Sequence, residues 1–297
     1  MRSAPRSPAA SASAGRTDGG SETHGGAACA ICDALGVNVY THGHHEAVLR
    51  SHSWRTAENS AGYLLAHLRP GLDLLDLGCG PGTITADLAR RVAPGRVLGI
   101  DSSAEVVAKA AELAGDGVEF AVGDAYALDV PDASFDVVHA HQVLQHLTDP
   151  VAAIAEAHRV LRPGGILAVR DSDYAAFFWA PADHRLDRWL ELYHQLTERN
   201  QAEADAGRYL PAWVRAGGFT DVTVTSSNWT FADAAGRAWW GGLWADRVEQ
   251  SAFATQAIEY GLSTEAELAD IAAGWRAWTD ERDGIFVVPS VEVLAHR

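Results

Sequence analysis

The stretch Leu74-Leu75-Asp76-Leu77-Gly78-Cys79-Gly80-Pro81-Gly82-Thr83 decides the fold. Its apolar first part is typical of a buried parallel strand, and the residues that follow it, 84–89, have the apolar spacing of a helix. The three glycines between them can adopt positive φ and bring no β-carbon that would hold a ligand away from the backbone. The start of the helix adds N–H groups that lack intrahelical partners. We therefore expect a strand, a tight turn and a helix, with an extended polar ligand lying across the turn.

The alternation of strand and helix continues as far as residue 170. The patterns predict strands at 96–101, 118–122, 135–140 and 166–170, and helices at 103–114 and 150–160. Ligands in open sheets of this kind bind outside the carboxyl ends of the strands. The segments at predicted strand ends should therefore converge on one crevice. They are 78–83, Asp101, Asp124 and 140–146.

Two acidic residues at strand ends suggest a nucleoside ligand. Asp101 lies about 20 residues beyond the glycine turn, where a carboxylate can accept hydrogen bonds from both hydroxyls of a ribose. Asp124 could accept from the exocyclic amine of an adenine, while Ala125 supplies a backbone N–H to the ring. The turn alone is weak support for NAD, because Thr83 stands where a GxGxxG motif has its last glycine.

Composition narrows the classes of partner. The 23 basic and 39 acidic residues of this 297-residue chain give a net charge of −16, so no nucleic-acid partner is expected. No apolar run approaches the roughly 18 residues that span a bilayer, so membrane insertion is not expected either. The three cysteines are too few for a disulfide framework, which favours a cytoplasmic location.

The N-terminal part of the chain divides into two predicted segments. Residues 1–28 have no hydrophobic period and are rich in Ala, Ser, Gly, Pro and Arg, which predicts a disordered tail. Residues 29–69 are predicted to form a lid, with a helix from Glu46 to Leu68. We expect Tyr40 and His45 of this lid to face the pocket, and the alternative is that its histidines are solvated.

Cys29 and Cys32 have the spacing of zinc ligands. No second pair of cysteines follows, however, and the histidines within 42–45 are not spaced as H-x(3 to 5)-H. We therefore predict no metal site.

Several spaced motifs together carry a resemblance to a known family. They are Asp-Leu-Gly-Cys-Gly-Pro-Gly-Thr at 76–83, Gly-Ile-Asp-Ser at 99–102, Gly-Asp-Ala at 123–125, Phe-Asp-Val-Val at 135–138 with His-Leu-Thr-Asp-Pro at 146–150, and Arg-Val-Leu-Arg-Pro-Gly-Gly at 159–165. Over residues 72–171 the chain resembles the class I S-adenosylmethionine-dependent methyltransferases. It is most similar to the branch of the ubiquinone and menaquinone biosynthesis C-methyltransferases and natural-product small-molecule methyltransferases.

The resemblance implies a fold and a set of cofactor contacts. The fold is α/β, a Rossmann-like seven-stranded, mostly parallel sheet with helices on both faces, an antiparallel last strand and helical insertions that form a substrate cap. The glycine turn should approach the methionine chain of the cofactor, and Asp76 should help to position its ammonium group, partly through water. The cofactor-binding residues implied are Asp76, Gly78, Cys79, Gly80, Asp101, Ser102, Asp124, Ala125, Ala140 and His141.

The reaction that the resemblance implies is an in-line displacement of a methyl group from a positively charged sulfur. Positioning of the acceptor and exclusion of water are the main tasks of the protein. A general base helps if the acceptor is a phenol, an enol or an activated carbon, and His141 and His146 are the candidates. Related enzymes often carry a histidine pair where this chain has Gln145-His146, and a structural role for His146 is the alternative.

The second half of the chain carries the predicted substrate cap. After the core at 70–174, an insertion at 175–218 predicts a helix at 183–203. A second insertion at about 233–280 separates the last two strands, 219–225 and 285–294, within 219–297. Nine of the ten tryptophans lie beyond residue 175, which indicates core packing or aromatic pocket walls. Residues expected to contact the acceptor are Tyr40, His45, Gln145, Arg170, Asp173 and Tyr174.

The sequence thus predicts a cytoplasmic, S-adenosylmethionine-dependent methyltransferase, with a homodimer as one possible assembly. Its expected acceptor is an oxygen or carbon atom of a hydrophobic, possibly aromatic small molecule such as a natural product or a quinone-like compound. Two alternatives stay open. One is a catalyst that binds the cofactor without methylating, such as a cyclase, and the other is a non-catalytic regulatory protein that binds it.

Overall fold

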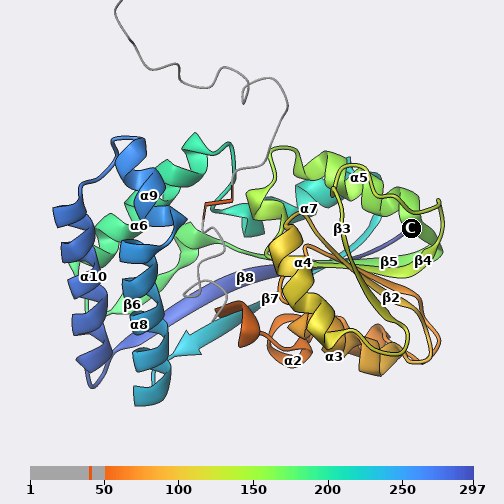
Figure 1. Ribbon diagram of the computed structural model, residues 1–297, viewed down its shortest axis with the longest axis horizontal. Coiled ribbons are helices and arrows are strands. Elements are labelled where there is room, and N and C mark those ends of the chain that lie inside the picture. The colour runs from red at the N-terminus through yellow and green to blue at the C-terminus, as the bar shows by residue number, and fades with distance from the viewer. Residues whose placement is uncertain (1–39, 42–50) are drawn as a thin grey trace, which may run out of the picture. The chain divides into compact units, whose positions relative to one another are not determined.

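One sheet organises the part of the chain that the computed structural model describes, residues 40–41 and 51–297 (Figure 1). Its order is β3-β2-β1-β4-β5-β8-β6, and β7 pairs with the other edge of β8. Strands β1 to β5 pair in parallel, whereas β8 runs antiparallel to β5, β6 and β7. The strands are β1 Leu74–Leu77, β2 Val97–Asp101, β3 Val118–Val122, β4 Phe135–His141, β5 Leu161–Ser172, β6 Phe178–Ala180, β7 Asp221–Phe231 and β8 Ile285–His296.

The predicted α/β fold, with a mostly parallel sheet and an antiparallel last strand, is confirmed. The sheet has eight strands where seven were predicted, because the short β6 adds to the edge of β8 beyond β5. Both last strands are also longer than predicted. They pair over eleven residues, from Asp221 opposite His296 to Phe231 opposite Phe286, although three helices separate them in sequence.

Helices cover both faces of the sheet because successive strand residues point to opposite sides. Leu74, Val97 and Val137 pack on one face with apolar residues of α2 and α3. Their neighbours Leu75, Leu98 and Val138 pack on the other face with α5 and α7. These helices are α2 Ala57–Ser60, α3 Thr83–Val92, α5 Pro150–Val160 and α7 Ala206–Ala216, and α4 Ala104–Ala110 follows β2.

The helix starts follow the local capping signals. The side chain of Ser103 accepts a hydrogen bond from the backbone of Val106 at the start of α4, and Asp149 accepts from Ala152 at the start of α5. The predicted helix at 150–160 is confirmed. The helix predicted at 103–114 ends earlier, and a 3-10 turn, Ala111–Leu113, continues it.

Four further helices form the cap, which gathers at the left of Figure 1 around the ends of β6, β7 and β8. They are α6 His184–Arg199, α8 Ala234–Gln250, α9 Ala252–Glu259 and α10 Glu265–Asp280. Their shared core is aromatic: the ring centroid of Trp189 lies 4.5 Å from that of Trp244 and 4.9 Å from that of Trp275. Burial of side chains of this size stabilises a fold by about 1.5–3 kcal/mol each. Both alternatives for the helical tryptophans are realised: Trp275 and Trp278 pack in this core, and Trp240 and Trp244 belong to the core and also line a pocket.

Two predicted segments differ from the structure. The single helix expected from Glu46 to Leu68 is wrong: within its described part, residues 51–53 are helical and the chain then turns at Trp54. Thr56 starts the separate helix α2 through a capping box, in which its side chain accepts from Asn59 and its own N–H donates to the Asn59 side chain. Helix α7 lies within the range assigned to the cap insertion, but it packs on the sheet.

The predicted tail at 1–28, the cysteines at 29 and 32 and His45 lie outside the described residues. Within the described ranges, every helix is too short or too polar to cross a membrane.

Candidate active site

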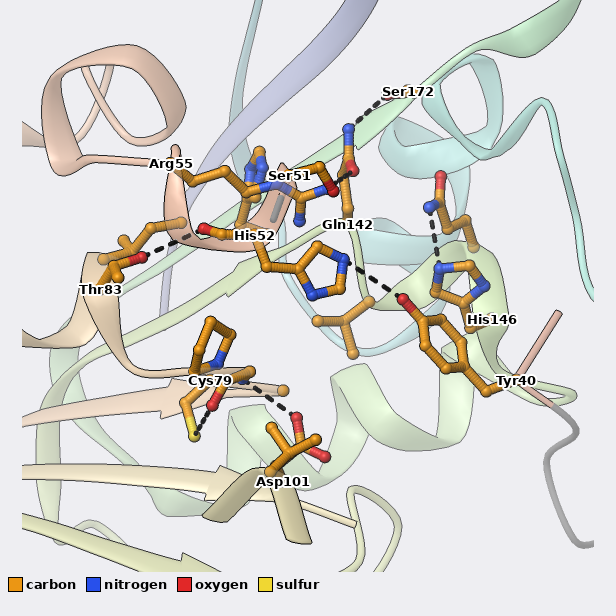
Figure 2. Close-up of a pocket in the computed structure, with 18 of the residues that line it drawn as sticks. Tyr40, Ser51, His52, Arg55, Cys79, Thr83, Asp101, Gln142, His146 and Ser172 are labelled. Atoms are coloured by element: carbon orange, nitrogen blue, oxygen red, sulfur yellow. Dashed lines mark hydrogen bonds between the residues drawn. The ribbon is translucent and has the colours of Figure 1, made fainter. Parts of the chain in front are cut away.

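A pocket opens at the carboxyl ends of the parallel strands, where the sheet meets the cap (Figure 2). Its walls combine the glycine turn after β1, the ends of β2 and β4, the segment 51–55 and the inner face of α8. The predicted convergence of separate segments on one crevice is therefore realised. Of the predicted residues, those that line it are Asp76, Gly78, Cys79, Gly80, Asp101, Ser102, Asp124, Ala125, His141, Tyr40, Gln145, His146 and Tyr174.

The glycines of the turn serve different purposes, although Gly78, Gly80 and Gly82 all have positive φ. A β-carbon on Gly78 would lie 2.4 Å from Val143, and one on Gly82 would lie 2.8 Å from the ring of Phe120. At Gly80 the nearest atom to such a carbon would be His52 Nδ1, at 3.9 Å. Gly78 and Gly82 are therefore required by packing, whereas a β-carbon on Gly80 would point into open space of the pocket.

Asp101 ties the turn to β2. Its Oδ2 accepts from the N–H of Gly80 at 3.1 Å, and its Oδ1 accepts from the N–H of Ser103 at 3.0 Å. A carboxylate oxygen has a second lone pair, so each oxygen can accept one more hydrogen bond from the pocket. The cradle beside Gly80 and this carboxylate fit the ribose and the methionine chain of an adenosyl cofactor. The adenine side has a similar carboxylate, Asp124, which accepts from the N–H of Tyr126 at 2.9 Å.

Asp76 is held by the protein on both sides. Its Oδ1 pairs with His139 Nδ1 at 2.7 Å, and its Oδ2 accepts from Thr85 Oγ1 at 2.5 Å. These buried contacts join β1 to β4 and to α3, so the carboxylate is a structural anchor as well as part of the pocket wall. The adjacent Cys79 stays a neutral thiol, because burial raises its pKa well above the usual range.

His141 is the histidine best placed for proton transfer. It lies at the end of β4, it is buried, and neither ring nitrogen has a hydrogen-bond partner within the described residues. Burial, with Arg55 nearby, holds the pKa of His141 well below its usual value, so the ring is a neutral base. Its ring centroid lies 5.7 Å from that of Trp229, an aromatic wall of the same pocket.

His146 is held in a more structural setting. Gln145 Nε2 donates to His146 Nε2 at 3.0 Å, and the ring of Tyr40 meets that of His146 edge-on at 4.8 Å. Burial lowers the pKa of His146 to about 3. The Tyr40 hydroxyl lies 3.4 Å from His52 Nε2, and burial raises the pKa of Tyr40 to about 12, so this phenol stays protonated at neutral pH.

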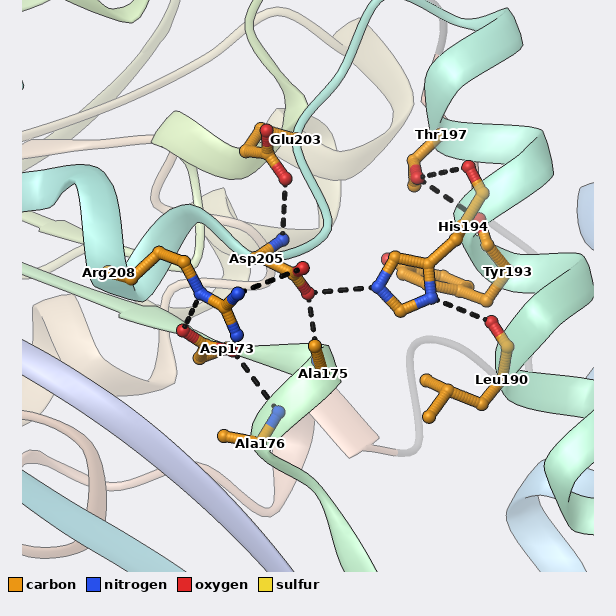
Figure 3. Close-up of polar contacts among 10 residues, drawn as sticks. All are labelled: Asp173, Ala175, Ala176, Leu190, Tyr193, His194, Thr197, Glu203, Asp205 and Arg208. Carbon is orange, nitrogen blue, oxygen red and sulfur yellow. Dashed lines mark hydrogen bonds and ion pairs between the residues drawn. The ribbon is translucent and has the colours of Figure 1, made fainter.

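Three predicted residues do not line the pocket. Ala140 is buried inside β4. Arg170 is buried within the sheet, where its Nε lies 3.3 Å from Ser227 Oγ and 3.5 Å from Glu292 Oε1. Asp173 turns toward α7 and forms a two-bond ion pair with Arg208, at 2.7 and 2.5 Å, as Figure 3 shows.

Several pocket residues were missed by the sequence reasoning. Arg55 donates to Gln142 Oε1 at 2.6 Å, and Gln142 donates onward to Ser172 Oγ at 2.7 Å, so this chain links the segment 51–55 to the ends of β4 and β5 (Figure 2). Gln142 has a positive φ of 53°, a strained conformation that places its side chain beside His141. Trp54 is partly exposed and also lines the pocket.

A Rossmann-like sheet with a glycine cradle after β1 and a carboxylate at the end of β2 defines an enzyme that binds an adenosyl cofactor. The methyltransferase domain family matches residues 75–169. An uncharacterized methyltransferase of Schizosaccharomyces pombe is 30% identical over 268 residues, 86% of this chain and 95% of that protein. The 2-methyl-6-phytyl-1,4-hydroquinone methyltransferase of Synechocystis is 33% identical over 202 residues, 66% of this chain and 59% of that enzyme.

Among solved structures, the YcgJ protein from Bacillus subtilis superimposes with a TM-score of 0.53 at 21% identity, over 81% of this chain and 98% of that one. At this identity the likeness concerns the fold alone. The family is shown by the Schizosaccharomyces pombe relative, which matches over most of both chains. The chain belongs to the S-adenosylmethionine-dependent methyltransferases, and S-adenosylmethionine is its cofactor.

Proposed function

We propose that this methyltransferase transfers its methyl group to an oxygen or carbon atom of a hydrophobic small molecule. One observation carries the proposal: a single pocket runs from the glycine turn to walls built by Phe177, Trp229, Trp239, Trp240 and Trp244. Aromatic walls of this kind suit a flat, apolar acceptor. The likeness to a hydroquinone methyltransferase supports the same class of acceptor.

The mechanism assigns separate tasks to the two ends of the pocket. S-adenosylmethionine, when bound, supplies an electrophilic methyl group on a sulfonium. Asp101 would accept from its ribose, and the open space beside Gly80 would receive its methionine chain. The aromatic walls would align the acceptor and exclude water.

His141 would remove the proton of the acceptor. It is neutral and buried, and its ring nitrogens have no protein partner among the described residues, so one of them can accept a proton from a phenol or enol. A base is useful for oxygen and carbon acceptors, whose nucleophilic forms are deprotonated. For that reason we favour O- or C-methylation over N-methylation.

We also propose that the enzyme works in the cytoplasm and does not bind nucleic acid. The small number of cysteines supports the location, and the net charge of −16 supports the absence of a polyanionic partner.

The test is a single-turnover incubation with S-adenosylmethionine labelled in the methyl group and an extract of candidate metabolites. We expect label in an apolar product whose mass exceeds that of its precursor by one methylene unit. The control is Asp101→Ala, which should bind the cofactor product S-adenosylhomocysteine more weakly and transfer little label. A changed product without added mass would indicate a cyclase, and absence of label from every fraction would indicate a non-catalytic binding protein.

A further inference from the structure

The pocket is divided by charge. The carboxylates that line it, Asp76, Asp101 and Asp124, lie at or near the carboxyl ends of the strands β1, β2 and β3. The guanidinium groups that line it come from the opposite side: Arg55 precedes α2, and Arg247 lies on α8 of the cap. The cofactor half is therefore acidic and the acceptor half is basic.

Within the described parts of the chain, no acidic side chain forms an ion pair with Arg55, and the buried carboxyl of Asp171 acts on it only from a distance. Arg55 donates a hydrogen bond to the neutral amide of Gln142, and its Nε is buried without a partner. Its Cζ lies 5.5 Å from the ring centroid of Trp229. The guanidinium is thus fixed in position by a neutral amide and an aromatic ring, with no described carboxylate in contact with it.

A second buried guanidinium lies behind the same wall. Arg170 Cζ is 4.8 Å from the ring centroid of Trp229, and both terminal nitrogens of Arg170 are buried without hydrogen-bond partners. Two acidic groups lie near it: the adjacent Asp171, and Glu292, which is reached only through Nε and is already hydrogen-bonded by Ser227 and Thr225. These groups balance the charge of Arg170 only in part, because both of its terminal nitrogens lack a hydrogen-bond partner. Burial lowers the pKa of Arg55 to about 10, as expected for a cation removed from water without a counter-ion.

A bound cofactor increases this imbalance, because its reactive sulfonium is itself a cation. A neutral acceptor would leave the guanidinium of Arg55 and the sulfonium in one pocket with no carboxylate in ion-pair contact with Arg55 among the described residues. Such an arrangement is costly, since a buried charge without a partner loses its hydration and gains nothing in return. An anionic acceptor would remove that cost and would be drawn toward the methyl group.

We propose that the acceptor carries a carboxylate, and that Arg55 receives it. The proposal rests on the proposed function, since it specifies the acceptor of that same pocket. The cofactor's own methionine carboxylate is the other possible source of this chemistry. Arg55 lies beside Gln142 and Ser172, at the ends of β4 and β5, and beside Trp229 on β7. This position favours the acceptor as the source of the carboxylate.

The experiment measures binding without turnover. Calorimetry first establishes the affinity of the protein for S-adenosylhomocysteine. The loaded protein is then titrated with three apolar carboxylates, benzoate, 2-naphthoate and decanoate, and with the primary amide of each. We expect at least one carboxylate to bind about 10- to 100-fold more tightly than its amide, as charge-assisted hydrogen bonds allow. In Arg55→Gln this preference should fall below about threefold, and the exposed control Arg90→Gln, on α3, should keep it.

The outcomes separate the possible failures. Lack of S-adenosylhomocysteine binding by the wild type would contradict the proposed function. Normal binding without a carboxylate preference in any of the three pairs would overturn the present inference and leave the proposed function standing. If Arg55→Gln weakens S-adenosylhomocysteine but not 5′-methylthioadenosine, which lacks the amino-acid part, and the carboxylate preference persists, the guanidinium serves the cofactor instead. If Arg55→Gln fails to fold, the three comparisons of a carboxylate with its amide on the wild-type protein still decide whether the acceptor site prefers a carboxylate.

Discussion

Two alanine substitutions in the glycine turn should affect different properties: Gly80→Ala should mainly weaken ligand binding, and Gly78→Ala should mainly lower stability. Gly80→Ala places a methyl group in open space beside His52, whereas Gly78→Ala drives one into the side chain of Val143. The two residues have similar φ, +54° and +66°, so both variants bear the same backbone strain. The difference between them therefore isolates what the added carbon meets.

The magnitudes follow from the surroundings. A non-glycine residue in the left-handed region costs about 1–2 kcal/mol, and this is the whole expected loss of stability in Gly80→Ala. In Gly78→Ala the collision at 2.4 Å adds an overpacking cost of about 1–3 kcal/mol. For a chain of this size each kcal/mol lowers the melting temperature by about 2–4 °C. We expect Gly80→Ala to weaken S-adenosylhomocysteine binding at least about tenfold, since its methyl group occupies the cofactor's space, equivalent to about 1.4 kcal/mol.

The assay combines thermal unfolding without ligand and calorimetry with S-adenosylhomocysteine. Gly80→Ala should melt within a few degrees of the wild type and bind poorly, while Gly78→Ala should melt at the lower temperature of the two. If Gly80→Ala binds with wild-type affinity, the cofactor does not approach the turn at Gly80, and the placement of the methionine chain is wrong.

Three further predictions test the chemistry and the scaffold. His141→Gln should lower kcat for methyl transfer to the acceptor about 10²- to 10⁴-fold. Because burial holds the pKa of His141 well below its usual value, wild-type activity should persist as the pH falls through 6.5. A loss of activity centred at that pH would count against a neutral base. Burial raises the pKa of Asp171 to about 7, so the folded state holds a proton that the unfolded state releases. The free energy of unfolding measured in urea should therefore fall by about 3 kcal/mol from pH 5 to pH 8. Asp171→Asn should largely abolish this dependence, and a flat wild-type profile would refute the reasoning. Arg208→Gln breaks the partly exposed ion pair with Asp173 and should lower the free energy of unfolding by only about 1 kcal/mol, measured by thermal unfolding. The affinity for S-adenosylhomocysteine should stay within about twofold of the wild type. A large loss of that affinity would mean that Asp173 acts on the pocket.

The cofactor half was predictable because its features are local. The glycine turn, Asp101 and Asp124 each follow a strand directly, and the carboxyl ends of parallel strands must lie along one edge of the sheet. The sequence around them therefore specifies both the residue and its position. The same locality explains why the helix starts near Ser103 and at Pro150 were predicted correctly.

The acceptor half was predicted only in part: Tyr40, Gln145 and Tyr174 line the pocket as expected, but other residues of this half meet only through tertiary contacts and were missed. Arg55 approaches Gln142 across 87 positions of sequence, and no periodicity records such a contact. The sequence did carry a partial signal, because Thr56 and Asn59 have the spacing of a capping box. A capping box marks the start of a helix, so it indicates a break in the single helix predicted there. Asp173 was misjudged for a related reason. Its position after β5 is right for the pocket, but its side chain caps the 3-10 turn Tyr174–Ala176 and turns to Arg208.

The long pairing of β7 with β8 brings the two ends of the second insertion together. Phe231 lies opposite Phe286, so the chain leaves the sheet for α8 and returns from α10 at neighbouring points. Segments that begin and end at one place can be lengthened, shortened or exchanged at small entropic cost. Helix α8 of this insertion supplies Trp239, Trp240, Trp244 and Arg247 to the pocket, whereas the residues proposed to contact the cofactor lie on other elements. Evolution, or an engineer grafting a foreign insertion between these two strands, can therefore alter which acceptor is methylated while the donor site is inherited unchanged.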